Sequence, residues 1–391
     1  MKRACPASKH SQSQRPVPNR SAHPQAGPIV ETIRQLVEIE SPSDVKQAVD
    51  RLGTILRGRF EELGAKVRVH PCEKYGNHLQ ADFPGRSKGK PVLLLGHMDT
   101  VYPIGAISRM PCRVADGRLY GPGVLDMKSG IALMLTALES LLSQGKLPRP
   151  VTVLLVSDEE IGSPSSRKIT EALAKKSSAV LVLEPSYGSH GAVKTSRKGV
   201  GEYTVRVTGK AAHSGLDFEK GQSAIIELAR QINAISSLTD PARGLTVNVG
   251  TVRGGTKSNV VPGSAEAAID VRITRKQDGA YIDRKLRALR PFNPKCQLEI
   301  HGGINRPPME RTAGVEALYR QAAKIAKKLG WDLQEASVGG GSDGNFTTAL
   351  GIPTLDGLGG VGDGAHAEHE HVVISELTKR AALLAKLIEN A

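Results

Sequence analysis

Histidine and carboxylate side chains recur in this sequence directly after apolar segments that are typical of buried strands. The first pair, His97 and Asp99, follows the apolar run 91–96. Residues at positions i and i+2 of a strand point to the same side, so these two side chains would project together. A carboxylate beside an imidazole fixes the orientation of a metal-binding histidine, although a histidine that only caps a strand end would look the same in isolation.

Asp126 lies between a turn and a helix. Glycine and proline at 121–123 favour the turn, and apolar residues at helical spacing follow from Lys128 to Gln144. An aspartate at this place can cap the helix N-terminus. Its two oxygens can equally bridge two cations, and the isolated motif does not separate these interpretations.

Glu159 and Glu160 follow the apolar segment 151–156. Adjacent carboxylates repel each other unless a cation or a proton lies between them. One glutamate can bind metal while its neighbour takes a proton from a water molecule. A solvated acidic loop would explain the charges, but not their position after yet another strand end.

Two further clusters complete the set. Glu184 follows the apolar segment 180–183, and three histidines, His366, His369 and His371, lie within the segment 362–371. A histidine-rich stretch can bind metal weakly, and only one of the three need be a ligand. Together the clusters supply histidine, aspartate and glutamate donors, a set that suits zinc.

The elements that would position these residues alternate between strand and helix from Pro28 to about Thr195. Strands are predicted at 66–70, 78–83, 91–96, 151–156 and 180–183, and helices at 29–40, 45–63 and 128–144. This order predicts an α/β fold with a mostly parallel sheet and helices on both faces. Open sheets of this kind place their sites at the carboxyl ends of the strands.

The pattern changes at Gly199. From there the sequence predicts a strand at 201–208, a helix at 222–235, strands at 245–252 and 266–273, a helix at 282–289 and a last strand at 297–300. This order predicts a ferredoxin-like unit. We therefore expect a main domain formed by 29–197 and 309–391, an inserted domain at 198–308, and a tail at 1–28.

Composition narrows the classes of function. The net charge is +14, and five basic residues but no acids lie in the Ser- and Pro-rich tail, which we expect to be disordered. The other basic residues are dispersed and aromatic residues make up only 3%, so a nucleic-acid partner is not expected. Neither a membrane span nor a signal peptide is predicted. Four widely spaced cysteines indicate free thiols and a cytoplasmic location.

From Ile29 to its end the chain resembles the co-catalytic zinc amidohydrolases, which include glutamate carboxypeptidases, aminoacylases, acetylornithine deacetylases and succinyl-diaminopimelate desuccinylases. The motifs that carry the resemblance are GHMDTV at 96–101, YGPG at 120–123 with DMK at 126–128, DEEIG at 158–162 and GKAAHSG at 209–215. The resemblance implies a zinc exopeptidase-like fold with an inserted dimerisation domain, and two zinc ions per subunit, with cobalt or manganese as alternatives.

The resemblance also implies a role for each site residue. It assigns His97 and Glu184 to one ion, Glu160 and His366 to the other, Asp126 to both and the general base to Glu159. The segment AHA at 365–367 followed by Glu370 matches the family's last ligand motif, which selects His366 among the three histidines. Asp99 remains the residue expected to orient His97.

Three residues of the inserted domain match family positions that act on the substrate. His213 would reach the site of a partner subunit in a homodimer and stabilise the oxyanion. Asn259 and Arg272 would bind the carboxylate or carbonyl end of the substrate. Without the resemblance, Arg272 would be interpreted as an exposed strand residue.

The glutamate carboxypeptidase branch matches best, through HMDTVY at 97–102, LEPS at 183–186, RPP at 306–308 and GGG at 339–341. We therefore expect hydrolysis of an amide or peptide bond next to a free C-terminal carboxylate, in a peptide or small molecule. An N-acyl-amino-acid deacylase or desuccinylase with the same site is the alternative. A catalytically silent metal-binding scaffold is disfavoured because Glu159 is present.

Overall fold

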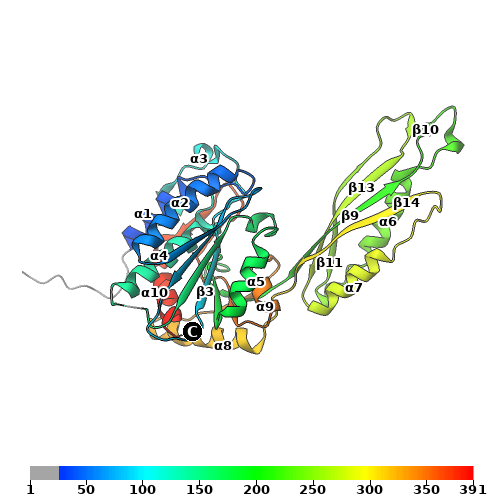
Figure 1. Cartoon of the computed structure of the whole chain (residues 1–391). Coiled ribbons are helices and arrows are strands. Elements are labelled where there is room, and N and C mark those ends of the chain that lie inside the picture. The colour runs from blue at the N-terminus through cyan, green and yellow to red at the C-terminus, as the bar shows by residue number, and fades with distance from the viewer. Residues whose placement is uncertain (1–25, 146, 391) are drawn as a thin grey trace, which may run out of the picture.

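The computed structural model describes residues 26–145 and 147–390, which form two domains (Figure 1). Positions 1–25 of the predicted tail lie outside the described residues. Helix α1 (Ala26–Val37) begins three residues earlier than predicted, so residues 26–28 belong to a helix and not to the tail. Among the described residues, no helix has both the length and the apolar character of a membrane span.

The larger domain is built on a six-stranded sheet. In spatial order its strands are β1 (Lys66–His70), β2 (His78–Phe83), β6 (Val151–Val156), β3 (Val92–His97), β7 (Ala179–Val182) and β16 (Thr354–Leu355). The four strands from β6 to β16 run parallel, whereas β1 and β2 join antiparallel at one edge. The predicted mostly parallel sheet is confirmed.

Helices cover both faces of this sheet, as predicted (Figure 1). On one face lie α1, α2 (Lys46–Glu62), α4 (Ser129–Leu142), α8 (Ala313–Lys328) and α10 (Ile374–Asn390). On the other lie α5 (Arg167–Lys176) and α9 (Gly344–Ala349), which contact each other. The residues of strand β3 show that both faces of the sheet are buried. Val92 and Leu94 pack into the hydrophobic core on the face of α1 and α4, and Leu93 and Leu95 pack into the core on the face of α5. An uninterrupted apolar run is what burial on both faces requires.

Short strands bring distant segments to the carboxyl edge of the main sheet. One small sheet has the order β17 (Gly362–Asp363), β18 (His371–Val373), β5 (Arg118–Tyr120) and β4 (Arg113–Ala115). The short helix α3 (Ala106–Arg109) precedes β4 in the chain. His371 lies opposite Tyr120 in this register, so the histidine-rich segment borders the turn that leads to Asp126. A second small sheet pairs β8 (Val193–Arg197) with β15 (Glu335–Val338) in parallel.

The inserted domain follows the predicted element order. It contains β9 (Gly199–Thr208), α6 (Ala224–Ser236), β11 (Thr246–Gly254), β13 (Ser264–Ile273), α7 (Lys276–Arg287) and β14 (Gln297–Arg306). Its sheet is antiparallel in the order β11-β13-β9-β14. Both helices pack on one face of that sheet. The two-residue strands β10 (Ala212–His213) and β12 (Val260–Val261) pair at the end of the domain farthest from the main sheet (Figure 1).

Candidate metal centre

His97 is the last residue of β3 and is almost fully buried, together with Asp99. The His97 Nδ1 atom lies 2.9 Å from the Asp99 carbonyl oxygen and 3.5 Å from Asp99 Oδ1. The Asp99 carboxylate also accepts hydrogen bonds from Ser43 Oγ and from the backbone N–H groups of Glu159 and Glu160. Asp99 therefore fixes both the imidazole ring and the loop that carries the two glutamates.

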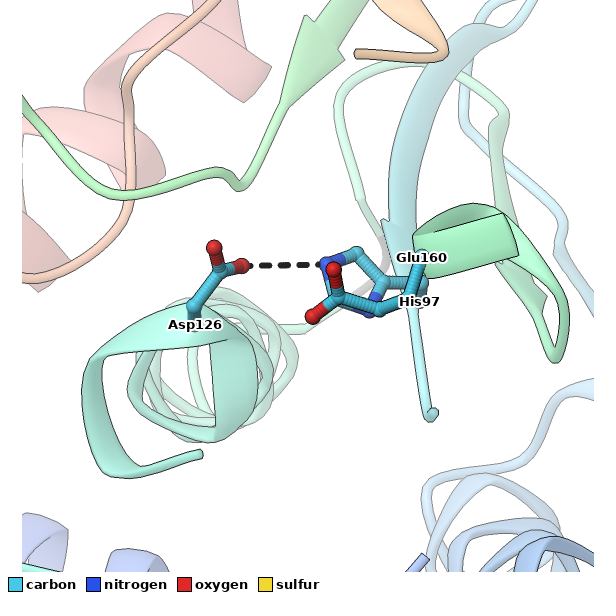
Figure 2. A group of neighbouring side chains, drawn as sticks. All are labelled: His97, Asp126 and Glu160. Carbon is cyan, nitrogen blue, oxygen red and sulfur yellow. Dashed lines mark hydrogen bonds and ion pairs between the residues drawn. The ribbon is translucent and has the colours of Figure 1, made fainter. Parts of the chain in front are cut away.

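Asp126 lies in the irregular turn Val124–Lys128 that precedes α4. Its side chain does not cap the helix and points instead toward His97 (Figure 2). Buried Glu370 positions this turn, because its carboxylate accepts hydrogen bonds from the backbone N–H groups of Gly123, Leu125 and Asp126 at 2.7–3.0 Å. The interpretation of Asp126 as an ordinary N-cap is wrong.

The five predicted metal ligands form two groups that share Asp126. His97 Nε2 lies 3.1 Å from Asp126 Oδ1 and 3.4 Å from Glu184 Oε1. His366 Nε2 lies 3.6 Å from Asp126 Oδ2 and 3.2 Å from Glu160 Oε2. A tetrahedral ion with bonds of about 2.0–2.1 Å separates neighbouring donors by about 3.3 Å, and the four histidine–carboxylate distances of these two triads are close to that value. Candidate donor atoms also lie within 4.8 Å of one another in the sets His97, Asp126 and Glu160, and His97, Glu159 and Glu184.

Burial and charge support the same fit. Glu160 Oε1 is buried and has no hydrogen-bond partner among the described residues, as expected for an oxygen that faces a cation. Burial opposes a charge on His97, but hydrogen bonds to Asp126, Asp99 and Glu184 outweigh it and raise the pKa of His97 well above its ordinary value. Hydrogen bonds to Asp126 and Glu160 raise the pKa of His366 to about 10. The cluster therefore attracts positive charge at both histidines.

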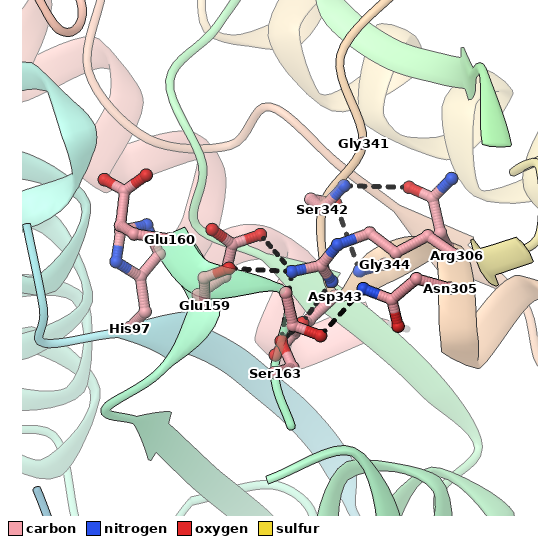
Figure 3. Close-up of polar contacts among 12 residues, drawn as sticks. His97, Glu159, Glu160, Ser163, Asn305, Arg306, Gly341, Ser342, Asp343 and Gly344 are labelled. Atoms are coloured by element: carbon pink, nitrogen blue, oxygen red, sulfur yellow. Dashed lines mark hydrogen bonds and ion pairs between the residues drawn. The ribbon is translucent and has the colours of Figure 1, made fainter. Parts of the chain in front are cut away.

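Glu159 lies beside the cluster and contacts Arg306 (Figure 3). One Arg306 nitrogen, Nη2, lies 3.0 Å from Glu159 Oε1 and donates to the Glu159 carbonyl oxygen at 2.9 Å. The other, Nη1, pairs with Asp343, and both partners are buried. Burial raises the pKa of Glu159 well above its ordinary value, although the charge of Arg306 opposes the shift. A raised pKa is what a general base that works near neutral pH needs.

The three predicted residues of the inserted domain do not reach this cluster within the chain. Exposed His213 lies in β10 at the remote end of the domain, where the carbonyl of Asn259 accepts a hydrogen bond from the N–H of Ser214 (Figure 1). Arg272 lies near the opposite end of β13, paired with Val200 in register, and its guanidinium forms an ion pair with Asp270 at 2.8 Å.

Sequence reasoning missed the residues that support the cluster. Arg306 appeared only as part of a family motif, and nothing in its sequence neighbourhood indicates contact with Glu159. Buried Arg197 binds Glu184 at 3.1 Å and Asp356 at 2.7 Å, and it had no sequence signal. Glu370 was noted beside the last ligand motif but received no role.

Comparisons with known proteins show the family of the chain. The model of peptidase family M20/M25/M40 matches residues 93–390. The chain is 31% identical over 367 residues to carboxypeptidase G2 of Pseudomonas sp. (strain RS-16), which covers 92% of this chain and 88% of that protein. It is 30% identical over 263 residues to the acetylornithine deacetylase of Salmonella paratyphi B, over 63% of this chain and 67% of that protein.

The fold is also similar to that of a solved structure, the Bacillus subtilis YXEP protein, described as a dinuclear metal-binding peptidase of the M20 family. The TM-score is 0.67 at 18% identity, and the match covers 93% of this chain and 97% of that chain.

Proposed function

The chain belongs to peptidase family M20/M25/M40 and is an enzyme that hydrolyses amide bonds, and we propose that it cleaves an amide or peptide bond next to a free C-terminal carboxylate, with glutamate as the released residue. The observation that carries the proposal is the pair of donor triads that share Asp126. The likeness to a protein named carboxypeptidase G2 supports the choice of bond.

His97 and Glu184 would hold one zinc ion and Glu160 and His366 the other, with Asp126 between them. Nitrogen and oxygen donors suit zinc, and cobalt or manganese are the alternatives. When bound, two such ions would polarise a scissile carbonyl and lower the pKa of a water molecule toward about 7.

Glu159 would act as the general base. Its carboxylate takes a proton from the attacking water and delivers it to the nitrogen of the leaving amine. Its contact with Arg306 holds the carboxylate beside the cluster, where one of its oxygens lies within 4.8 Å of the donor atoms of His97 and Glu184. Its raised pKa favours the protonated form that the second transfer requires.

His213 would complete the site of a second copy of the chain in a homodimer. An exposed histidine at the end of an inserted domain, remote from the cluster in its own chain, is placed to do so (Figure 1). A hydrogen-bond donor aimed at the developing oxyanion would stabilise the transition state. The dimer is thus part of the proposed mechanism.

The alternative function is an N-acyl-amino-acid deacylase, which the likeness to an acetylornithine deacetylase supports. Both reactions use the same metals and base, so the substrate decides between them. Zinc-loaded protein should be screened with dipeptides and N-acyl amino acids in which the acyl group and the C-terminal residue vary separately. Turnover that depends on a C-terminal glutamate supports the carboxypeptidase. Turnover that depends on an acetyl or succinyl group, whatever the amino acid, contradicts it.

A further inference from the structure

A cavity of about 780 Å³ opens beside the metal centre. The ligands Asp126, Glu184 and His366 line one side of it. Lys194, Arg197 and Arg118 also line it. A site that holds part of a small substrate next to reacting groups has this form, with a few polar groups to set the orientation.

Lys194, in strand β8, differs from the other cations of this cavity. Only 8% of the residue is exposed, yet its ammonium group has no hydrogen bond or ion pair with any residue in the described ranges. Burial and the charge of Arg197 lower its pKa, while Asp356 and Glu184 oppose that shift. Because the residue lines the cavity and its ammonium group has no partner among those residues, that group is available to pair with an anion that enters the cavity.

The remaining charges of the wall do not compensate Lys194. Arg197 is engaged with Glu184 and Asp356, which therefore already have a cation. In the proposed enzyme Asp126 and Glu184 would bind metal ions, which would neutralise their carboxylates, so neither would pair with Lys194. Of the remaining charged side chains of the lining, Arg118 and Lys194 are basic and Asp363 is acidic, so the net charge that faces the cavity is positive.

We propose that Lys194 binds a carboxylate of the substrate, and so fixes the acidic residue on the amine side of the scissile bond. The inference rests on the proposed function, because it assumes a substrate with a free carboxylate. The proposal also replaces Arg272, which the family resemblance implied, as the residue that binds the substrate carboxylate. Arg272 is engaged with Asp270 and does not line this cavity, whereas Lys194 lines it and has no partner in the described chain.

The test uses three zinc-loaded variants: Lys194→Met, which removes the charge, Lys194→Arg, which keeps it, and Lys175→Met as a control. Lys175 is an exposed lysine on α5, outside the cavity. The substrates are N-benzoyl-glutamate, its α-amide and its γ-amide. Loss of one charge-assisted hydrogen bond predicts a kcat/KM for N-benzoyl-glutamate about 10–100-fold lower in Lys194→Met, mainly through KM.

The two amides show which carboxylate Lys194 binds. If the penalty of Lys194→Met disappears with the α-amide, Lys194 binds the α-carboxylate; if it disappears with the γ-amide, Lys194 binds the side chain. Lys194→Arg should recover most of the loss, and Lys175→Met should show none. An equal loss for the acid and both amides, or no loss at all, overturns the proposal.

A binding measurement separates this proposal from the proposed function. Calorimetry should compare glutarate binding to the zinc-loaded Glu159→Gln protein with and without Lys194→Met. Weaker binding in the double variant by about 10-fold or more supports the carboxylate site even if no substrate is hydrolysed. Equal affinity overturns the role of Lys194 even if the wild type proves to be a carboxypeptidase.

Discussion

Predicted site residues lie in two regions of the molecule: the cluster at the strand ends of the main domain, and the inserted domain. In the first region these residues lie together, and in the second they lie apart. In the cluster, His97 and His366 each lie 3.1–3.6 Å from two carboxylates that come from distant parts of the chain. In the inserted domain, His213 and Asn259 lie at one end and Arg272 at the other, and none contacts the cluster. The first region brings its predicted donors together within one chain, whereas the second would act, under the proposed function, in the site of a partner chain.

The difference follows from the two sheets. Parallel strands end at the same edge, so residues that come after β3, β6 and β7 meet there although they are distant in sequence. Antiparallel strands end at alternate edges, so residues that flank one strand are separated by its length. Thus Asn259 precedes β13 at one end, and Arg272 is near its other end.

The largest effect should follow from removing the shared ligand. Asp126→Ala takes a donor from both triads, so we expect loss of measurable turnover and a fall from about two bound ions per chain. Elemental analysis of the zinc-loaded proteins measures this. Asp332→Ala, at an exposed position, is the control and should keep both ions. A wild type with a single ion that Asp126→Ala does not disturb would disprove the two-metal assignment.

The next effect concerns the base. Glu159→Gln keeps the shape of the side chain but cannot accept the proton, so kcat should fall about 10²–10⁴-fold with metal content unchanged. Steady-state kinetics and elemental analysis measure the two quantities. Glu62→Gln on the surface should behave like the wild type. Near-normal turnover of Glu159→Gln at saturating substrate would show that another group is the base.

The third prediction tests whether the inserted domain completes the site of another chain. His213→Ala should lose about 10²–10³-fold in kcat, the usual cost of an oxyanion donor. Co-expression of His213→Ala with Glu159→Gln should restore roughly a quarter of wild-type activity, because half the dimers are mixed and each holds one intact site.

The rescued site pairs the Glu159 of the His213→Ala chain with the His213 of the other chain. A site confined to one chain could not be rescued, since each chain keeps its own defect. Purified mixed dimers without recovered activity would therefore contradict the shared site and leave the metal chemistry intact. Each variant expressed alone is the control.

The smallest effect should come from the residue that holds the turn of Asp126. Glu370→Gln places an amide where three backbone N–H groups require an acceptor, so metal affinity should fall about 10–100-fold. Competition with a chelator measures it. Glu368→Gln, an exposed neighbour, should leave the affinity unchanged. Unchanged affinity in Glu370→Gln would show that the turn holds Asp126 without this carboxylate.

The sequence alone was enough to predict the fold class and the residues of the strand-end cluster. Uninterrupted apolar runs such as 92–95 require burial on both faces, and that requirement leads to a parallel sheet whose carboxyl edge collects the residues at the end of each strand. His97 and Glu160 could thus be predicted as neighbours without coordinates, whereas Asp126, which precedes a helix, was assigned to the cluster only through the family resemblance. The order of elements after Gly199 likewise predicted the inserted unit.

Only the tertiary structure shows the supporting contacts, because they join segments whose separation in sequence has no periodic signal. Arg306 reaches Glu159 across 147 positions, and Glu370 reaches the N–H of Asp126 across 244. Lys194 carries no distinguishing signal within the polar segment 194–197, and only the packing around β8 leaves the residue 8% exposed and its ammonium group without a partner among the described residues. Side-chain pairing across a fold depends on the path of the backbone, which local sequence patterns do not encode.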